Sequence, residues 1–434
     1  MSERGLRGLR HANDSSLYED VVRNTVPVHA RMVHGLDSSD QPCSTPAPYD
    51  VHGEHLRVVD RAFLNRRLLE SLDEHENVKV FYEHKLLSAN LDRQEAVFNA
   101  VVSKPRPPEL HLPAEVPEPA SPVLSDTKTV QYDLLIGSDG AYSMTRQCIS
   151  KYGRLNLQQT WIDVMWCEFV IRPNKDGEHR LSSKHLHIWP QDDYMFIALP
   201  DQNSTFTCNL FGPRSLFLEL EANPDRVVPL FRKSFPGVVP DLIEPNVLQE
   251  MFVQNPHLPL LDLRCTPYNY SDSCVIIGDA AHAMVPFYGQ GLNTGFEDVQ
   301  ILFQDFIDQR HWTKSDADLK EPTILDSYTE FREPDLRTIN DLALENYTDM
   351  KVGVNQTSVK FRKWVEERMS LYAPLLGWET LYRRVAFSGE RYSVAKAKSE
   401  RQRRVLFGTC TLGVVGLSYG AVWMFKQVAV KAAQ

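Results

Sequence analysis

The sequence predicts a mixed α/β (α+β) fold that combines an incomplete Rossmann-like domain, an antiparallel sheet, a helical C-terminal region and a C-terminal transmembrane helix. Three observations lead to this prediction. Two apolar runs end at Gly137 and Gly278 and lead into acidic turns, residues 161–211 alternate between apolar and polar positions, and residues 405–425 carry no charge. Buried strands that end in glycine turns are typical of open α/β sheets, and alternation is typical of antiparallel sheets.

The composition is that of a globular protein and argues against several classes. Of 434 residues, 42% are hydrophobic and 24% are charged, which is ordinary for a folded chain. The formal net charge of -10 argues against a nucleic-acid-binding protein, because such proteins normally carry a basic face. The cysteines are scattered without a C-x-x-C pair, so we expect reduced thiols and neither a disulfide scaffold nor a metal site.

The first part of the chain predicts helices and short strands. Residues 3–10 are charged and helix-prone, and residues 61–74 repeat leucine at helical spacing. Apolar runs at 78–82 and 96–98 predict two short strands. Residues 103–127 are crowded with prolines, which predicts an exposed insertion within a hairpin.

The middle of the chain predicts strands of two kinds. Residues 132–136, which are apolar except for Asp133, and the unbroken apolar run at 274–277 predict buried strands. From Leu292 onward the pattern is mostly helical up to the uncharged run. Alternating stretches predict strands that pair antiparallel through short turns, at 185–189, 194–199 and 205–211.

The uncharged run at 405–425 predicts a membrane span. Its 21 residues reach across about 30 Å of hydrocarbon at roughly 1.5 Å per residue. A buried core helix is the alternative. The terminal position and the flanking cations favour a tail-anchored protein, in which the preceding residues lie on one side of the membrane. These cations are Lys396, Lys398, Arg401, Arg403 and Arg404 before the run, and Lys426 and Lys431 after it.

The first motif, D-L-L-I-G-S-D-G-A-Y-S-M-T-R at 133–146, joins a buried strand to a tight turn. Asp139 and Gly140 form this turn, and Ser143 is placed to cap the helix that follows. A glycine at such a turn allows the backbone to approach a ligand closely.

The second motif, C-V-I-I-G-D-A-A-H-A at 274–283, repeats this arrangement about 140 residues later, with Gly278 and Asp279 after the strand. The loop at 286–293 then opens a helix. Ligands bind at the carboxyl ends of strands in open α/β sheets, where an aspartate can accept hydrogen bonds from sugar-like hydroxyls. The free amides of the helix can stabilise negative charge. His282 has no partner at metal-ligand spacing, so we assign it a packing role.

The two motifs, in this order and with a β-rich stretch between them, resemble those of the FAD-dependent aromatic hydroxylases. The resemblance implies FAD as the cofactor, NADPH and O2 as co-substrates, and no separate NADPH-binding domain. It also implies a division of the chain into units. These are 1–160 and 266–310 for the two parts of the FAD-binding domain, 161–265 for a β-rich substrate domain, 311–400 for a helical C-terminal region, and 405–425 for the anchor.

Within these hydroxylases the chain is most similar to the kynurenine 3-monooxygenases. The similarity is carried by V-P-V-H-A-R-M-V-H at 26–34, H-L-H-I-W-P at 185–190, the stretch 278–298, and F-S-G-E-R-Y at 387–392. It implies hydroxylation of kynurenine beside its aniline nitrogen. It also implies a place on the mitochondrial outer membrane, with the catalytic part facing the cytosol.

The same resemblance implies roles for individual residues, each of which could instead be structural. A guanidinium can hold a carboxylate through a fork of two hydrogen bonds. The substrate carboxylate would be held by Arg31, Tyr49, Asn355 and Tyr392, and the catalytic ring side of the pocket would be lined by Pro286, Phe287 and Gln290. The flavin would lie near Arg61, Leu86, Asp139, Gly140, Gly278, Asp279, Leu292 and Asn293.

The opening of the chain departs from the family pattern. The family begins with a strand and G-x-G-x-x-G, whereas this sequence opens with residues similar to a later helix. We therefore expect an incomplete pyrophosphate site and weaker FAD binding. Three hypotheses stay open: an active membrane-tethered enzyme, a truncated non-catalytic or vestigial kynurenine-binding membrane protein, and a hydroxylase of another aromatic acid.

Overall fold

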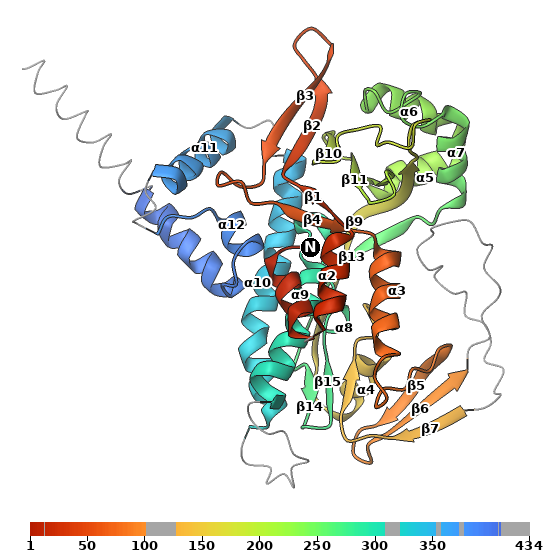
Figure 1. Ribbon diagram of the computed structural model, residues 1–434, viewed down its shortest axis with the longest axis vertical. Coiled ribbons are helices and arrows are strands. Elements are labelled where there is room, and N and C mark those ends of the chain that lie inside the picture. Colours follow the sequence, from red (N-terminus) through yellow and green to blue (C-terminus); the bar gives the residue numbers. More distant parts are fainter. Residues whose placement is uncertain are drawn as a thin grey trace, which may run out of the picture.

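The computed structural model describes residues 1–12, 14–100, 127–308, 322–352, 357–372, 377–406 and 408. Figure 1 shows two halves: an upper half built on one large sheet, and a lower half with two smaller sheets. The long helix α10 (Ile324–Val352) runs along both halves. Helix α10 therefore contacts both the half that contains the large sheet and the half that contains the two motifs.

A seven-stranded sheet forms the upper half, in the order β13-β9-β12-β11-β10-β2-β3. The antiparallel pairing predicted for the β-rich stretch is confirmed. One pair differs, because β10 and β2 run parallel, with Ala30 opposite His185. The strands are β2 (Ala30–Leu36), β3 (Pro42–Pro48), β9 (Asn156–Ile171), β10 (His185–Pro190), β11 (Met195–Pro200), β12 (Phe206–Gly212) and β13 (Leu258–Thr266).

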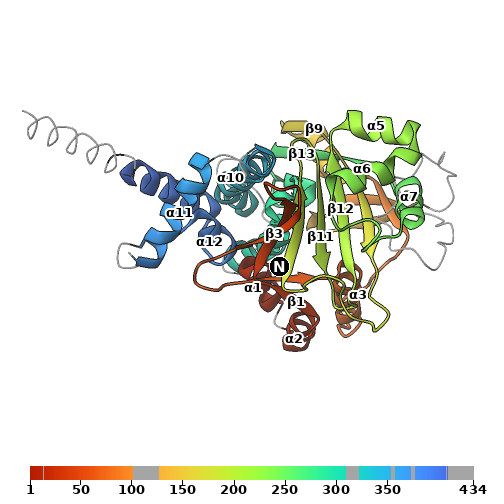
Figure 2. The same cartoon turned by 90° about the horizontal axis from the view of Figure 1, so that it is seen from above.

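Three helices and a short 3-10 turn cover one face of this sheet (Figures 1 and 2). Their apolar sides pack on the strands around fully buried rings that include Phe169, Phe196, Phe231 and Phe235. The Phe231 and Phe235 ring centroids lie 4.9 Å apart in an edge-to-face arrangement, which aromatic pairs favour. The elements are α5 (Arg214–Ala222), η1 (Pro224–Arg226), α6 (Val227–Ser234) and α7 (Pro245–Gln254).

The lower half holds the two predicted motif strands side by side. β8 (Leu135–Gly137) pairs in parallel with β15 (Cys274–Ile276), and β14 (Asn269–Tyr270) pairs antiparallel with β15. The β15 side chains are fully buried, so the prediction of a buried strand there is confirmed. The helices that follow the two strands are α4 (Met144–Tyr152) and α8 (Asp279–His282).

A third sheet contains β5 (His84–Asn90), β6 (Glu95–Ala100) and β7 (Thr127–Gln131). The strand predicted at 96–98 is confirmed as part of β6. The strand predicted at 78–82 is wrong, because this segment pairs with no strand and the Phe81 side chain is 57% exposed beside Lys128. An apolar run without a neighbouring strand gains no ladder hydrogen bonds. Residues 103–126 of the predicted insertion lie outside the described residues.

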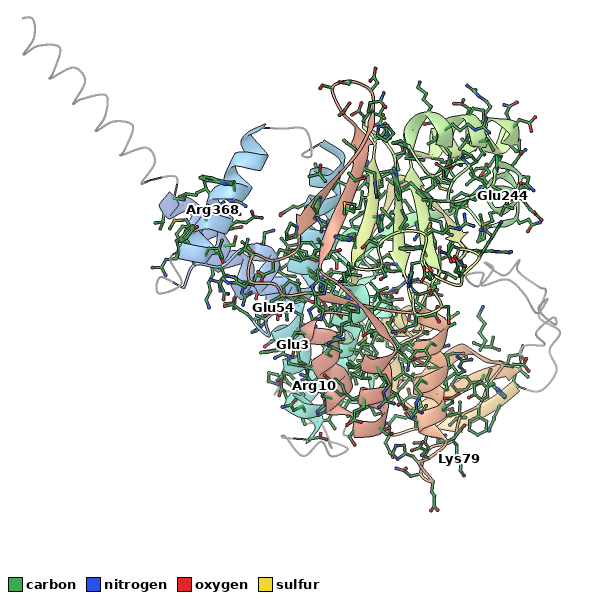
Figure 3. The ribbon with its side chains drawn as sticks, turned by 45° about the horizontal axis from the view of Figure 1, so that its top comes forward. Glu3, Arg10, Glu54, Lys79, Glu244 and Arg368 are labelled. Atoms are coloured by element: carbon green, nitrogen blue, oxygen red, sulfur yellow. The ribbon has the colours of Figure 1, made fainter. Side chains whose placement is uncertain are left out.

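Three helices of the N-terminal part lie in front of the lower half (Figure 1). The helices predicted at 3–10 and 61–74 are confirmed. Figure 3 labels Glu3 and Arg10 on the first of them, and their side chains pair at 2.9 Å. The elements are α1 (Glu3–His11), α2 (Ser15–Arg23), α3 (Arg61–Leu72), and the antiparallel pair β1 (Thr25–Val28) and β4 (Leu56–Val59).

Helix α1 packs closely on α9 (Gly291–Ile301), the helix that follows the second motif. Gly5 and Gly8 make this approach possible, since a methyl group on them would collide with Asn293 and with the backbone of Phe296. The Ser2 amide also donates to Asn293 Oδ1 at 2.8 Å. The start of α9 is therefore covered by α1.

The C-terminal part is helical, as predicted for the chain beyond Leu292. α9 continues into η3 (Leu302–Asp308), and α11 (Thr357–Tyr372), α12 (Leu381–Ala386) and helical residues 392–406 follow α10. In the part of the chain that the structure describes, no helix is both long and apolar enough to cross a membrane. The span predicted at 405–425 lies almost entirely outside the described residues.

Candidate active site

The two Gly-Asp turns lie next to each other. Gly137 is opposite Ile276 in the parallel pair, and the Ile277 amide donates to the Gly137 carbonyl at 3.0 Å. Arg146 joins the turns from below, donating to the carbonyls of Ala280 and Ala141 at 2.7 Å each. Arg146 is the last residue of the first motif, but its role is visible only in the fold, which brings the two carbonyls together.

The two aspartates have different surroundings. Asp139 is engaged by its own loop, accepting hydrogen bonds from Ser143 Oγ at 2.5 Å and from the Thr145 amide at 3.0 Å. Asp279 is exposed and has no hydrogen-bond partner among the described residues. Asp279 is therefore the carboxylate available to a ligand hydroxyl, whereas Asp139 shapes its turn.

Three glycines leave open space at this edge of the sheet. Gly140, Gly278 and Gly289 have φ values of +77°, +59° and +69°, and no atom lies within 4 Å of the position that a Cβ would occupy. The backbone here can approach a flat ligand without obstruction. These glycines and the free Asp279 carboxylate leave room for a ligand with hydroxyl groups, which is the chemistry of the FAD predicted from the sequence.

The other predicted cofactor residues lie on several elements. Asn293 is buried at the start of α9 and donates to the Gly289 carbonyl at 2.9 Å, while Leu292 is 47% exposed. Leu86 packs against the core beneath the two turns, and Arg61 is exposed at the start of α3. The proposed flavin contacts of these residues stay predictions.

Arg31 lies in a cluster of tyrosines on the other side of this region. Its guanidinium carbon is 5.4 Å from the Tyr49 ring centroid and 5.6 Å from that of Tyr382. The Tyr49 and Tyr382 rings stack at 5.6 Å, and Tyr288 stacks on Tyr382 at 5.7 Å. Sequence reasoning named Arg31 and Tyr49 but missed Tyr288 and Tyr382. Tyr288 stands in the 286–293 loop and could have been included, whereas Tyr382 lies in no motif.

The Arg31 cluster is a cation site with no anion among the residues that the structure describes. Arg31 pairs with no carboxylate among the described residues, and its buried Nε atom has no hydrogen-bond partner there. Burial alone lowers the pKa of the guanidinium, but the Tyr382 and Tyr49 hydroxyls raise it overall, so the charge is kept. Arg31 is half-buried, and an unpaired cation that is partly withdrawn from water is costly, so this arrangement favours a ligand that brings a carboxylate.

Tyr392 was predicted to bind the same carboxylate, and in the structure its hydroxyl is engaged by two residues at the start of α9. The hydroxyl lies 3.0 Å from Thr294 Oγ1 and donates to Gln290 Oε1 at 3.3 Å. The Arg4 guanidinium carbon lies 3.8 Å above the ring centroid. Tyr392 thus supports the start of α9 here, and its predicted role stays untested. Asn355 lies outside the described residues.

The predicted ring-side residues lie in η2 (Pro286–Tyr288) and just beyond it. Phe287 is half-buried, with its ring centroid 5.2 Å from Phe211 and 4.6 Å from Tyr347. Pro286 is exposed and Gln290 is buried. The turn thus stands between the large sheet and α10.

His282 is buried, as a packing role implies, but it also belongs to an ion-pair network. Its Nε2 lies 2.5 Å from Asp298 Oδ2, and Asp298 also accepts from the Gly278 amide and from Arg332 Nε. Burial opposes ionisation of Asp298, but His282 and Arg332 outweigh it and lower the carboxyl pKa to about 2. The network therefore ties the second Gly-Asp turn to α9 and α10.

A chain of hydrogen bonds joins β2 to β10 beside Arg31. His187 Nε2 donates to the Ser182 carbonyl at 2.9 Å, so its Nδ1 accepts from His34 Nε2 at 2.8 Å. His34 Nδ1 then accepts from Ser44 Oγ. In this arrangement a proton added to His187 would set its Nδ1–H against the His34 Nε2–H, whereas a proton added to His34 Nδ1 would meet the Ser44 hydroxyl, which can accept it. Burial chiefly, and then His187, lowers the pKa of His34 to about 4.

We expect this histidine pair to make stability depend on pH. The folded state favours neutral His34, so its contribution is present above the ordinary pKa of 6.5 and is lost as pH falls toward 4. We expect a loss of the order of 1 kcal/mol, because water screens a half-buried ring. Urea unfolding gives the free energy of unfolding at pH 7.5 and at pH 5. The difference between these two values should be smaller for His34→Phe than for the parent. An equal difference in both proteins would contradict this expectation.

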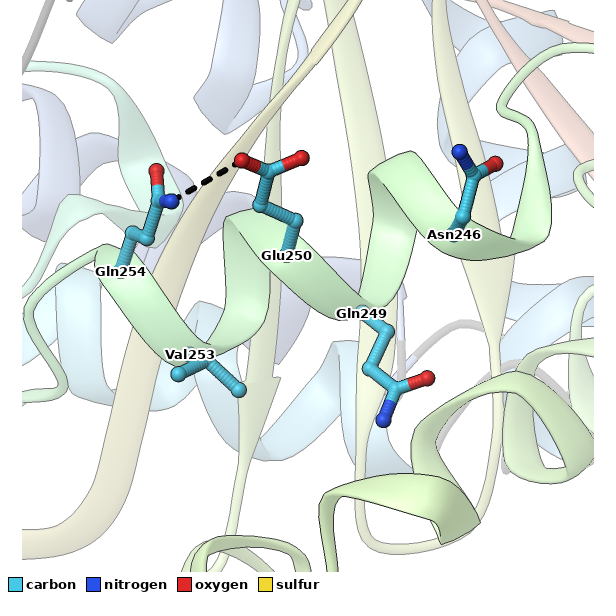
Figure 4. A pocket seen from close by; sticks show the side chains of 5 residues that line it. All are labelled: Asn246, Gln249, Glu250, Val253 and Gln254. Carbon is cyan, nitrogen blue, oxygen red and sulfur yellow. Dashed lines mark hydrogen bonds between the residues drawn. The ribbon is translucent and has the colours of Figure 1, made fainter.

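A shallow hollow on the outer side of α7 lies apart from these residues (Figure 4). It is lined by Asn246, Gln249, Glu250, Val253 and Gln254, all from α7. Gln254 donates to Glu250 at 3.0 Å. It contains no residue of the two turns or of the Arg31 cluster, so we assign it no part in the chemistry.

Sequence comparisons match the chain to flavoproteins over most of its length. The family model described as "FAD binding domain" matches residues 117–342. A kynurenine 3-monooxygenase of Neosartorya fischeri is 43% identical over 431 residues, covering 98% of this chain and 82% of the relative. One of Aspergillus fumigatus is 42% identical over the same shares of the two chains.

Solved structures of flavin-dependent monooxygenases have a similar fold. Pseudomonas aeruginosa PqsL, in complex with 2-aminobenzoylacetate, aligns with a TM-score of 0.58 at 15% identity, over 81% of this chain and 85% of that one. Klebsiella pneumoniae HpxO, complexed with FAD and uric acid, aligns with a TM-score of 0.53 at 15% identity, over 84% and 82%. At this identity the similarity shows the fold alone, a mixed α/β architecture with antiparallel sheets.

Proposed function

The chain belongs to the kynurenine 3-monooxygenase family, and we propose that it hydroxylates L-kynurenine to 3-hydroxykynurenine with FAD, NADPH and O2. One observation in the structure carries this proposal. Arg31, a cation without an anion among the described residues, lies in a tyrosine cluster that includes Tyr288 of the turn after the second motif. Kynurenine has the matching chemistry, since an amino-acid carboxylate is joined to an aniline ring.

In this proposal the substrate is held at two ends. Arg31 binds the carboxylate through a fork of hydrogen bonds, and the neighbouring Tyr49 hydroxyl adds a further donor. Phe287 contacts the aromatic ring, and its packing against Phe211 and Tyr347 keeps water away from this side. Holding both ends places one ring carbon consistently, which is the main task of the protein in such a reaction.

The cofactor would lie along the edge formed by the two turns. Asp279 can accept hydrogen bonds from its hydroxyl groups, and Gly278 and Gly289 allow the backbone to approach its ring. Free amides at the start of α9 stabilise negative charge there. Bound FAD supplies the redox chemistry, taking electrons from NADPH and activating O2.

The test is an assay of the full chain with a panel of aromatic acids. The chain is supplied with FAD, NADPH oxidation is followed, and products are identified by mass. We expect kynurenine to stimulate oxidation and to gain one oxygen atom. A response to another acid but not to kynurenine would indicate a different hydroxylase. The absence of flavin absorbance after reconstitution, together with kynurenine binding, would indicate a non-catalytic binding protein.

We further propose that residues 405–425 anchor the protein in the mitochondrial outer membrane, with the catalytic part facing the cytosol. The support is the uncharged run of membrane-spanning length with cations on both sides. Deletion of residues 403–434 is expected to move the protein from the membrane pellet to the soluble fraction after carbonate extraction. A deleted form that still pellets would contradict the anchor.

A further inference from the structure

The turn η2 bears two aromatic side chains that lie in different parts of the site. Phe287 packs between Phe211 of the large sheet and Tyr347 of α10. Its neighbour Tyr288 instead stacks on Tyr382 within the Arg31 cluster. The conformation of this one turn therefore determines how far the ring-side contact lies from the cation.

Helix α10 holds this turn through two consecutive residues. Asn346 Nδ2 donates to the Phe287 carbonyl at 2.7 Å. The Tyr347 ring stacks on the Phe287 ring at 4.6 Å with an interplanar angle of 27°. Asn346 thus fixes the peptide plane of Phe287, and Tyr347 fixes the Phe287 side chain.

The other contacts described for the turn lie on its side chains or at its end, because Phe287 packs on Phe211, Tyr288 stacks on Tyr382, and Asn293 donates to the Gly289 carbonyl at 2.9 Å. Within η2 the Gly289 amide bonds to the Pro286 carbonyl at 3.0 Å, and Gly289 then adopts a left-handed conformation at φ +69°. Three residues of 3-10 helix are only marginally stable by themselves. The part of α10 that holds the turn has a contact of its own. Lys396 Nζ pairs at 2.9 Å with Glu345, which precedes Asn346 in the helix.

We propose that Asn346 and Tyr347 are positioning residues, which hold η2 so that Phe287 meets the substrate ring at a fixed distance from the Arg31 cluster. This inference rests on the proposed function. Neither residue needs to touch the substrate. Their loss should leave the carboxylate site intact while the ring is held less consistently, and a small misplacement of a reacting group is costly in rate.

The experiment compares matched variants of the full chain. Asn346→Leu removes the amide donor at similar size, Tyr347→Leu removes the stack, and Tyr347→Phe keeps it. Thr348→Val is the control, because Thr348 is exposed and its hydroxyl bonds only to the Leu344 carbonyl of its own helix among the described residues. Hydrogen–deuterium exchange of residues 286–290 is measured without ligands, and kcat, KM and product formed per NADPH are measured with kynurenine.

In Asn346→Leu and Tyr347→Leu we expect exchange at 286–290 to rise about tenfold. We also expect kcat to fall about tenfold and product per NADPH to drop, while KM changes less than about twofold. Tyr347→Phe and Thr348→Val should resemble the parent. Unchanged exchange in both leucine variants would overturn the proposal, as would a rise in KM without a fall in kcat. If even the parent fails to hydroxylate kynurenine, the proposed function fails, and the exchange data still decide whether α10 holds the turn.

Discussion

Replacement of Arg31 by alanine is expected to weaken kynurenine binding by about 1.5–3 kcal/mol, or roughly 10- to 150-fold in Kd. The substrate carboxylate would lose its only cationic partner among the described residues and would face the Tyr49 and Tyr382 hydroxyls alone. Titration calorimetry measures the loss directly. Steady-state kinetics should show it mainly as a higher KM, because the ring contacts at Phe287 are unchanged.

Two controls separate this role from a general disturbance of the pocket. Arg31→Lys keeps the charge but loses the planar fork, so we expect an intermediate loss. A kynurenine analogue without the carboxylate should bind the parent and Arg31→Ala about equally. If alanine weakened both ligands to the same extent, Arg31 would be acting through the structure of the pocket and not through the carboxylate.

Replacement of Arg332 by leucine is expected to destabilise the fold by about 3–5 kcal/mol, because it breaks two buried ion pairs and leaves Asp298 to His282 and Glu297 to Arg4. Arg332 Nε donates to Asp298 at 2.8 Å and its NH2 donates to Glu297 at 2.8 Å, with all three side chains at most 5% exposed. A chemical denaturation curve of the parent and of Arg332→Leu measures the difference in free energy of unfolding.

Arg337, one turn further along α10, provides a matched control. It pairs with Glu333 at 2.5 Å, but its side chain is 64% exposed. Arg337→Leu should therefore cost no more than about 0.5 kcal/mol. Similar losses in the two variants would show that the buried network is not what makes Arg332 important. The stability that ionised Asp298 contributes should be present above about pH 4 and be lost as pH falls toward 2.

Much of the fold could be predicted because the relevant signals are local. The apolar run at 274–277 and the alternating run at 194–199 both became strands, since each pattern reports burial directly. The two Gly-Asp turns lie next to each other because their strands pair in parallel and therefore end at the same edge, and this pairing is visible only in the structure. The prediction of a strand at 78–82 was wrong because it assumed burial, and no strand in the described part of the chain pairs with this segment.

The rest of the site could not be predicted because it depends on long-range contacts. β2 joins the large sheet through a parallel pairing with β10, more than 150 residues away, and this pairing places Arg31. Tyr382 faces Arg31 from α12, and no local pattern marks it. His282 was correctly assigned to packing, but its ionic partner Asp298 lies on another helix. The position of Arg31, the approach of Tyr382 and the partner of His282 all depend on contacts between segments far apart in the chain, and a single sequence does not show such contacts.

The parallel pairing of β8 with β15 has a consequence for how the protein is made. Every residue of the large sheet from β9 to β13 lies between these two strands in the chain. On the ribosome, β8 must therefore wait for more than a hundred residues of translation before its partner emerges. Arg146 meanwhile lacks the Ala280 carbonyl that it binds in the finished protein. Such non-local closure slows folding, so the nascent chain exposes an unpaired apolar strand during synthesis and depends on protection from aggregation at that stage.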